Sequence, residues 1–282
     1  MSIKGVSPRT PLSVVVGIDG SKAAIQAALW AVDEALSRGV PLRLLYAIEP
    51  DDASGPHMAA RKLAIAENAV RYAFTAVEAA GTPVKIEVEI TQERPITALI
   101  RASTSAAMVC VGAVGVHHFR PGRVGSTAAA LASSAHCAVA VIRSEQTAGR
   151  TGLIVVDVHG SIDNGVLLGS AIEEARLRNA ALRAVTCRPN AGDDDADAER
   201  RIRADLERRL ARWTKRYPDV RVETAALHGS LLDDLAANAA SVQLVVVGAR
   251  DHQGMGELLG PSGNAVLHNA ACSVLIVDHQ HL

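Results

Sequence analysis

Short apolar runs alternate along the first half of the chain with longer segments that carry alanine and other apolar residues at helical spacing. Runs of this length, rich in valine and isoleucine, predict strands, and the uninterrupted ones suit a parallel sheet that is buried on both faces. The predicted strands cover residues 12–18, 41–47, 84–90, 108–111 and 138–142. With helices between them, the order β-α-β-α-β-α-β-α-β predicts a five-stranded parallel layer with right-handed crossovers.

The sequence also marks helix ends and one sheet edge. Ser21 is a suitable N-cap for the first helix, and Gly39 is placed to end it. The strand over residues 84–90, VKIEVEI, alternates between apolar and polar residues, so we expect it nearer an edge of the sheet. Helices are predicted over residues 22–38, 58–80 and 95–106, and over the alanine-rich segment that follows Gly125.

The whole pattern recurs in the second half of the chain. Matching positions are 140 residues apart near the start (Asp19 and His159) and 135 apart near the end (Cys137 and Cys272). The sequence therefore predicts an α/β fold of two tandem domains, each a five-stranded parallel sheet with helices on both faces. The predicted boundaries are residues 1–143 for the first domain, 144–152 for a polar linker and 153–282 for the second domain.

Residues 108–141 hold the clearest chemical signal. An apolar strand leads into a glycine-punctuated loop, and the loop leads into a helix. Backbone N–H groups can approach a phosphate closely at glycine, and a helix N-terminus adds free donors and a favourable dipole. The stretch therefore predicts a phosphate-binding loop. Its residues are Gly112, Gly115, Gly125, Ser126 and Thr127.

Composition excludes several other classes of function. Of the 282 residues, 49% are hydrophobic, 21% are charged and only 2% are aromatic, with a formal net charge of −1. There is neither a broad basic field nor a stacking surface for nucleic acid. No apolar stretch approaches the length of a membrane helix, and residues 1–11 do not resemble a secretory signal, so we expect a cytoplasmic protein. Four isolated cysteines, without a C-x-x-C, favour buried reduced thiols over a redox pair.

With these motifs placed, the chain resembles a tandem universal stress protein along nearly its whole length. VVVGIDGS at the first strand end is similar to the opening motif of that family. The spacing Gly112-x2-Gly115-x9-Gly125-Ser126 is similar to its ATP-binding signature. The resemblance implies a Rossmann-like fold of the adenine nucleotide alpha hydrolase-like type. It also implies that the two last strands, over residues 138–142 and 274–278, pair across a pseudo-two-fold axis.

The resemblance implies a role for each motif residue in binding ATP. Asp19 would accept from the ribose or the base, Ala47 would line the adenine, and the backbone of Val111 and Gly112 would lie against the base and ribose. Gly115, Gly125, Ser126 and Thr127 would wrap the phosphates. Positive charge at the loop would come from Arg120, Arg123 and the His117-His118 pair.

Binding fits this site better than turnover. The chain has no G-x-x-x-x-G-K-[ST] motif, no lysine inside the glycine loop and no arranged nucleophile or general base. We therefore expect a nucleotide-dependent stress or regulatory protein rather than an enzyme. A nucleotide-free scaffold and a slow ATPase stay open as alternatives. So do Mg²⁺ entry with ATP, a homodimer and the identity of a protein partner.

The second copy departs from the motif where phosphate contacts are expected. His159 replaces the aspartate, Asp157 replaces an earlier glycine, and Asp251 puts an anion where phosphate oxygens should approach. Pro261 replaces Ser126 and lacks both the hydroxyl and the backbone N–H. The sequence therefore predicts that the first copy binds ATP and that the second binds it weakly or not at all.

Overall fold

The structure is a computed structural model that describes residues 12–51, 55–115, 125–143, 152–158, 165–188, 196–249 and 252–277. We call the described residues up to 143 domain 1 and those from 152 onward domain 2. In domain 1 the elements are β1 (Ser13–Gly17), α1 (Lys22–Arg38), β2 (Leu42–Ala47), α2 (Pro56–Ala79), β3 (Ile86–Thr91), α3 (Pro95–Ser103), β4 (Ala106–Gly112), α4 (Ser126–Ser134) and β5 (Ala138–Ile142).

Domain 2 repeats this order, and two helices, α8 and α9, are described before its last strand. Its elements are β6 (Leu153–Asp157), α5 (Gly165–Leu177), β7 (Ala181–Arg188), α6 (Ala196–Arg216), β8 (Val222–His228), α7 (Leu231–Ala237), β9 (Val242–Gly248), α8 (His252–Leu259), α9 (Pro261–Asn269) and β10 (Ser273–Val277). Helix α8 was not predicted from the sequence.

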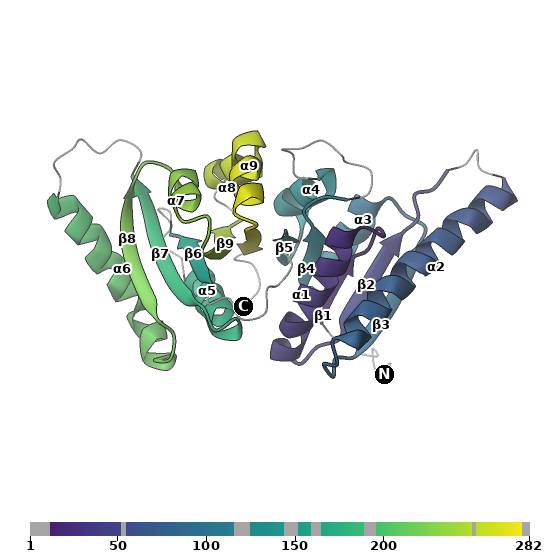
Figure 1. The fold of residues 1–282 in the computed structure, drawn as a ribbon, viewed down its shortest axis with the longest axis horizontal. Helices are drawn as coiled ribbons and strands as arrows, with labels where there is room; N and C mark the ends of the chain where they lie inside the picture. The colour runs from purple at the N-terminus through teal and green to yellow at the C-terminus, as the bar shows by residue number, and fades with distance from the viewer. Residues whose placement is uncertain are drawn as a thin grey trace, which may run out of the picture.

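The strands form one sheet in the order β3-β2-β1-β4-β5-β10-β9-β6-β7-β8. Neighbouring strands within each domain are parallel. Helices cover both faces, and α2 and α6 lie on the two outer flanks (Figure 1). The predicted α/β, Rossmann-like fold of two tandem domains is confirmed, and β3, which carries the alternating sequence, lies at the sheet edge as expected.

The two domains join through their last strands. β5 and β10 pair antiparallel, with Val141 opposite Val274 and Val139 opposite Ile276. These strands are apolar and almost fully buried, because each would otherwise leave an open hydrophobic edge. The predicted pairing of the last strands within one chain is confirmed. We refer to this junction as the seam.

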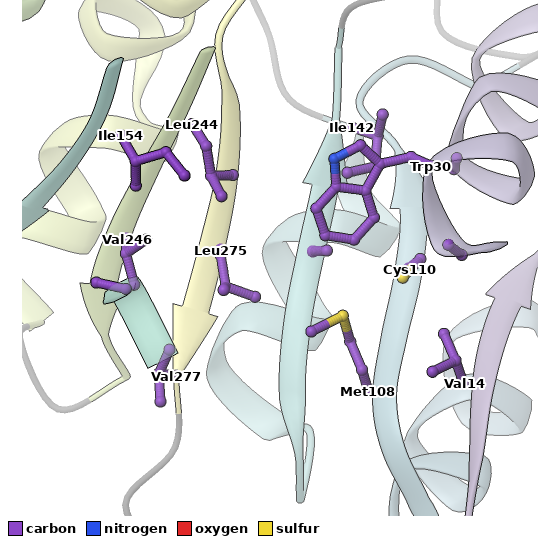
Figure 2. Close-up of a cluster of buried hydrophobic side chains, with 14 of the residues drawn as sticks. Val14, Trp30, Met108, Cys110, Ile142, Ile154, Leu244, Val246, Leu275 and Val277 are labelled. Atoms are coloured by element: carbon purple, nitrogen blue, oxygen red, sulfur yellow. The ribbon is translucent and has the colours of Figure 1, made fainter. Parts of the chain in front are cut away.

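One core cluster continues across the seam on the face covered by α1, α2, α5 and α6. Figure 2 shows part of it, with Trp30 beside Ile142 on the domain 1 side and Leu275 and Val277 on the domain 2 side. The opposite face is covered by α3, α4, α7, α8 and α9. The sheet therefore carries one continuous core on each face.

Local signals fixed several element ends correctly. Ser21 accepts a hydrogen bond from the Ala24 N–H as the N-cap of α1, and Gly39 ends that helix in the left-handed conformation with φ of 64°. The helix predicted over 95–106 was too long: α3 ends at Ser103, because the chain turns there and Ala106 already begins β4. Cys110, Cys137 and Cys272 are buried as expected, whereas Cys187 is half-buried.

Candidate functional site

The chain order creates a crossover point between β1 and β4. From β1 the chain continues to β2 and β3 on one side, and it then returns to β4 on the other side. The helices that follow lie on opposite faces, with α1 and α2 on one and α3 and α4 on the other. In open parallel sheets a ligand crevice forms at the carboxyl ends of strands at such a point. The predicted site residues all end or follow β1, β2 or β4.

Asp19 lies two residues after β1 and is anchored to the start of α1. The Ser21 backbone N–H donates to Asp19 Oδ1 at 2.9 Å. The side chain is exposed at the edge of the sheet. A Cβ added to Gly115 would lie only 2.6 Å from Asp19 Oδ2, so the carboxylate lies directly against the Gly115 backbone. The fold thus brings together Asp19 and Gly115, two predicted site residues that lie far apart in the sequence.

Gly112 ends β4 against the first turn of α1. A Cβ at this position would lie 2.7 Å from both the backbone carbonyl carbon and the Cβ of Ala23. Because real Cβ atoms do not approach so closely, any side chain here would push α1 away from β4. The glycine is therefore required by packing, independently of any ligand.

The N-terminus of α4 faces the same edge. Gly125 is its N-cap and makes no side-chain capping bond, while its own N–H donates to the Ala113 carbonyl at 3.2 Å. The first-turn N–H groups of Ser126 and Thr127 have no partner within the helix. Ser126 is exposed and Thr127 is half-buried. Donors at the helix start are thus available to an anion. Residues 116–124, with His117, His118, Arg120 and Arg123, lie outside the described residues.

Ala47 ends β2 and Val111 lies near the end of β4, the two strands on either side of β1. Val111 is buried in the core on the α3 and α4 face, and Ala47 is half-buried and packs against the same cluster. Tyr46 was missed by the sequence analysis. Burial, together with the charge of the nearby Asp19 carboxylate, raises the pKa of the Tyr46 hydroxyl. The one sequence signal that could have identified Tyr46 is its position next to Ala47 at the end of β2.

In domain 2, helix α8 covers the start of α9, the helix that corresponds to α4. Helix α8 packs across the first turn of α9, with Met255 and Leu258 buried in the core. A Cβ added to Gly263 would lie 2.2 Å from the Glu257 carbonyl oxygen and 2.5 Å from that of Leu258. Backbone oxygens at the C-terminal, negative end of α8 therefore lie beside the first turn of α9.

The remaining departures of domain 2 are only partly described. Pro261 is the first residue of α9, so this position offers no N–H donor. Asp157 ends β6 as a buried carboxylate, 6% exposed, at the position that matches Gly17. His159 and Asp251 lie outside the described residues.

Groups of three or more potential metal ligands are absent from the residues that the structure describes. Within the same residues, no helix has the length and apolar character needed to cross a membrane. An open hollow of about 420 Å³ lies at the C-terminal end of α2, lined by Phe74, Pro83 and neighbouring residues. It is remote from the predicted site residues.

Comparison with known proteins decides the family. A family model described as the Universal stress protein family matches residues 12–143 and 151–278. Universal stress protein Rv2028c of Mycobacterium tuberculosis is 62% identical over 276 residues, covering 96% of this chain and 98% of the relative. The chain belongs to the universal stress protein family. The resemblance inferred from the motifs is thereby confirmed, including its tandem form.

Two further similarities place this universal stress protein among two-domain members. Universal stress protein Rv3134c of Mycobacterium tuberculosis is 47% identical, with 98% of this chain and 99% of that one covered. A crystal structure of a universal stress protein from Archaeoglobus fulgidus DSM 4304 matches with a TM-score of 0.70 at 16% identity. It covers 94% of this chain and 96% of that chain, which supports the fold alone.

Within this universal stress protein the two domains share their scaffold and differ at the carboxyl edge. The helices α4 and α9 both begin at a glycine N-cap without a side-chain capping bond. Domain 1 presents a carboxylate and a bare glycine backbone, whereas domain 2 presents the carbonyl end of α8 and a proline. The sequence reading had identified Pro261 as a departure. It could not identify α8, because the segment contains Gly254 and Gly256 and so has poor intrinsic helix propensity.

Proposed function

We propose that domain 1 binds ATP and that the chain acts as a nucleotide-dependent stress or regulatory protein. The observation that carries the proposal is the contact of the Asp19 carboxylate with the Gly115 backbone beside the uncapped start of α4. A carboxylate that accepts from ribose hydroxyls and a helix start that donates to phosphate are the two polar ends that a nucleotide requires.

The residues present fit an adenine nucleotide. Asp19 would accept hydrogen bonds from the ribose or the base, and Ala47 and the backbone of Val111 and Gly112 would contact the adenosine. Gly115, Gly125, Ser126 and Thr127 would hold the phosphates. A side chain at Gly115 would collide with Asp19, so the absence of a Cβ there keeps this cradle open. Mg²⁺ would enter with the nucleotide rather than through a dedicated carboxylate cage.

Domain 2 is proposed to bind ATP weakly or not at all. Helix α8 lies against the start of α9, and the carbonyl oxygens of its last turn would repel phosphate oxygens. Pro261 removes one further donor. Each unmade contact costs roughly 1–3 kcal/mol of binding free energy. Two such losses are enough to separate the affinities of the two domains by roughly thirtyfold or more.

We propose binding rather than catalysis as the role of the site. Asp19 is held by the Ser21 N–H and lies against Gly115, an arrangement suited to accepting a hydrogen bond rather than to activating a water molecule. The alternatives are a scaffold without nucleotide and a slow ATPase. The proposal and its alternatives predict different nucleotides bound to the purified protein.

Native mass spectrometry separates these readings. The protein purified without added nucleotide, and again after incubation with ATP and Mg²⁺, is expected to carry a mass increment equal to one ATP. Absence of any nucleotide after incubation would favour the scaffold. Conversion of the bound species to ADP or AMP with time would favour the ATPase. Either result would replace the proposed function.

A further inference from the structure

Four charged side chains form a buried cluster where α1 of domain 1 meets α5 of domain 2. We call Glu34, Arg38, Glu174 and Arg178 the seam cluster. Arg38 pairs with Glu34 and Arg178 pairs with Glu174, each one helical turn along the same helix. Arg178 also crosses the seam and donates to Glu34 at 2.5 Å. Arg38 lies 3.8 Å from Glu174. The cluster therefore links the two domains by charge.

The cluster is withdrawn from water to an unusual degree. The side chains of Glu34, Glu174 and Arg178 are 0%, 3% and 6% exposed, and only Arg38, at 30%, reaches the surface. The guanidinium of Arg178 lies over the Trp30 ring at 4.3 Å. Burying four ionisable groups is costly unless each is paired, so the protonation of this cluster matters for the packing of the domains.

The cluster reflects the internal repeat. Glu34 matches Glu174 and Arg38 matches Arg178, each pair 140 positions apart in the sequence. A pseudo-two-fold contact brings the same patch of each domain together, and so it places like charges next to one another. The carboxyl groups of Glu34 and Glu174 contact the same guanidinium, that of Arg178, from the two sides of the seam. Two carboxylates held this close repel one another, and a proton on one of them removes the repulsion.

We propose that Glu34 and Glu174 share one proton across the seam, and that the stability which this proton gives to the packed domains falls as the pH rises through neutrality. The geometry resembles two carboxylates that share a site, where one ionises readily and the other resists. The proposal does not depend on nucleotide binding.

The electrostatic surroundings agree with this assignment. Burial and then the neighbouring Glu34 charge raise the pKa of Glu174 to about 8, against the opposing effect of Arg178 and Arg38. Burial opposes ionisation of Glu34 as well, but Arg178 and Arg38 overcome it and lower its pKa. The cluster also affects the pKa of the Cys110 thiol: burial raises this pKa most, and the charge of Glu34 raises it further. The proton therefore resides on Glu174, with Glu34 ionised between the two arginines.

The sign of the pH effect follows from linkage. Glu174 has a folded pKa of about 8 against an ordinary value of 4.5, so the folded protein holds one more proton than the unfolded chain between these values. Stability from this group is complete below pH 4.5 and is lost as the pH rises through about 8. Glu34 acts in the opposite sense, with a contribution that is present above pH 4.5 and lost in acid.

Urea unfolding between pH 5.5 and 8.5 tests the proposal with Glu174→Gln, because glutamine keeps the shape and a donor but cannot lose a proton. We expect the unfolding equilibrium constant of the wild-type chain to gain a factor approaching ten per pH unit from this one group between about pH 5.5 and 7.5. In Glu174→Gln that factor should be absent. The matched control is Glu78→Gln, which changes an exposed glutamate on α2 and should keep the wild-type slope.

Carbon NMR of the glutamate carboxyl groups in the wild-type chain gives a readout that needs no variant to fold. One assigned resonance, that of Glu174, is expected to keep the protonated shift at pH 6.5 and to titrate near pH 8. Ionisation of every glutamate below pH 6 would overturn the proposal. So would a wild-type pH slope in the folded Glu174→Gln variant.

Discussion

Gly115→Val is expected to weaken ATP binding by roughly a hundredfold while leaving the fold intact. The new Cβ would lie 2.6 Å from Asp19 Oδ2, so either the carboxylate or the loop backbone must move. In either case the site loses a contact to the ribose and one to the phosphates. At about 1.5 kcal/mol each, these two losses weaken binding by roughly a hundredfold. Isothermal titration calorimetry measures the affinity, and circular dichroism checks the fold.

Gly55→Val is the matched control for this substitution. Like Gly115, Gly55 lies outside the strands; it is exposed, its φ is −69°, and a Cβ there would meet nothing within 4 Å. The variant should therefore bind ATP with the affinity of the wild-type chain. If Gly115→Val kept that affinity too, the assignment of the glycine loop to the phosphates would be wrong.

Arg178→Ala is expected to destabilise the chain by about 3–5 kcal/mol at pH 7. Arg178 pairs with Glu174 on its own helix, donates to Glu34 of the other domain and covers the Trp30 ring. Removing it leaves the buried Glu34 carboxylate with Arg38 as its one remaining cation in the seam cluster. An ion pair at this depth is worth little against an apolar substitute, but breaking it from one side leaves a charge that water cannot reach.

Urea unfolding followed by the far-ultraviolet signal measures this loss. Arg208→Ala serves as the control, because Arg208 is 76% exposed and pairs with Asp205 on the surface of α6. Surface ion pairs contribute about 0–1 kcal/mol, so that variant should unfold close to the wild-type midpoint. A loss below about 1 kcal/mol for Arg178→Ala would show that the seam cluster does not hold the domains together.

The strand pattern of this fold could be predicted because its parallel strands are buried on both faces. The run over residues 108–111 and its repeat in β9 have no polar positions, and such runs are rarely found outside a covered sheet. The apolar character of β5 and β10 at the domain edges indicated that each would be paired, and the resemblance to the family implied that they pair with each other. The internal repeat then supplied the number of domains.

Long-range packing set the limit of the sequence analysis. The glutamates and arginines of the seam cluster read in sequence as ordinary i,i+4 pairs on two helices, because their burial depends on a helix 140 residues away. Helix α8 was missed because its two glycines argue against a helix, while burial of Met255 and Leu258 against the core overrides that propensity.

At the site, the sequence identified residue types but not their contacts. The spacing of Gly112, Gly115 and Gly125 pointed to a phosphate loop, yet only the fold shows that Gly112 serves packing against Ala23 whereas Gly115 lies against Asp19. The position of Tyr46 close to Asp19 likewise depends on how β2 lies beside β1. Comparison of the two domains shows which residues the nucleotide proposal rests on, namely those that domain 1 has and domain 2 lacks.

Calorimetric titration of the intact chain with ATP in the presence of Mg²⁺ tests the central claim most directly. A carboxylate against a bare glycine backbone in domain 1, and a proline with α8 carbonyl oxygens beside it at the start of α9 in domain 2, predict a single site with a stoichiometry of one ATP per chain. Heat from two equivalent sites per chain, or no binding heat at all, would contradict the account.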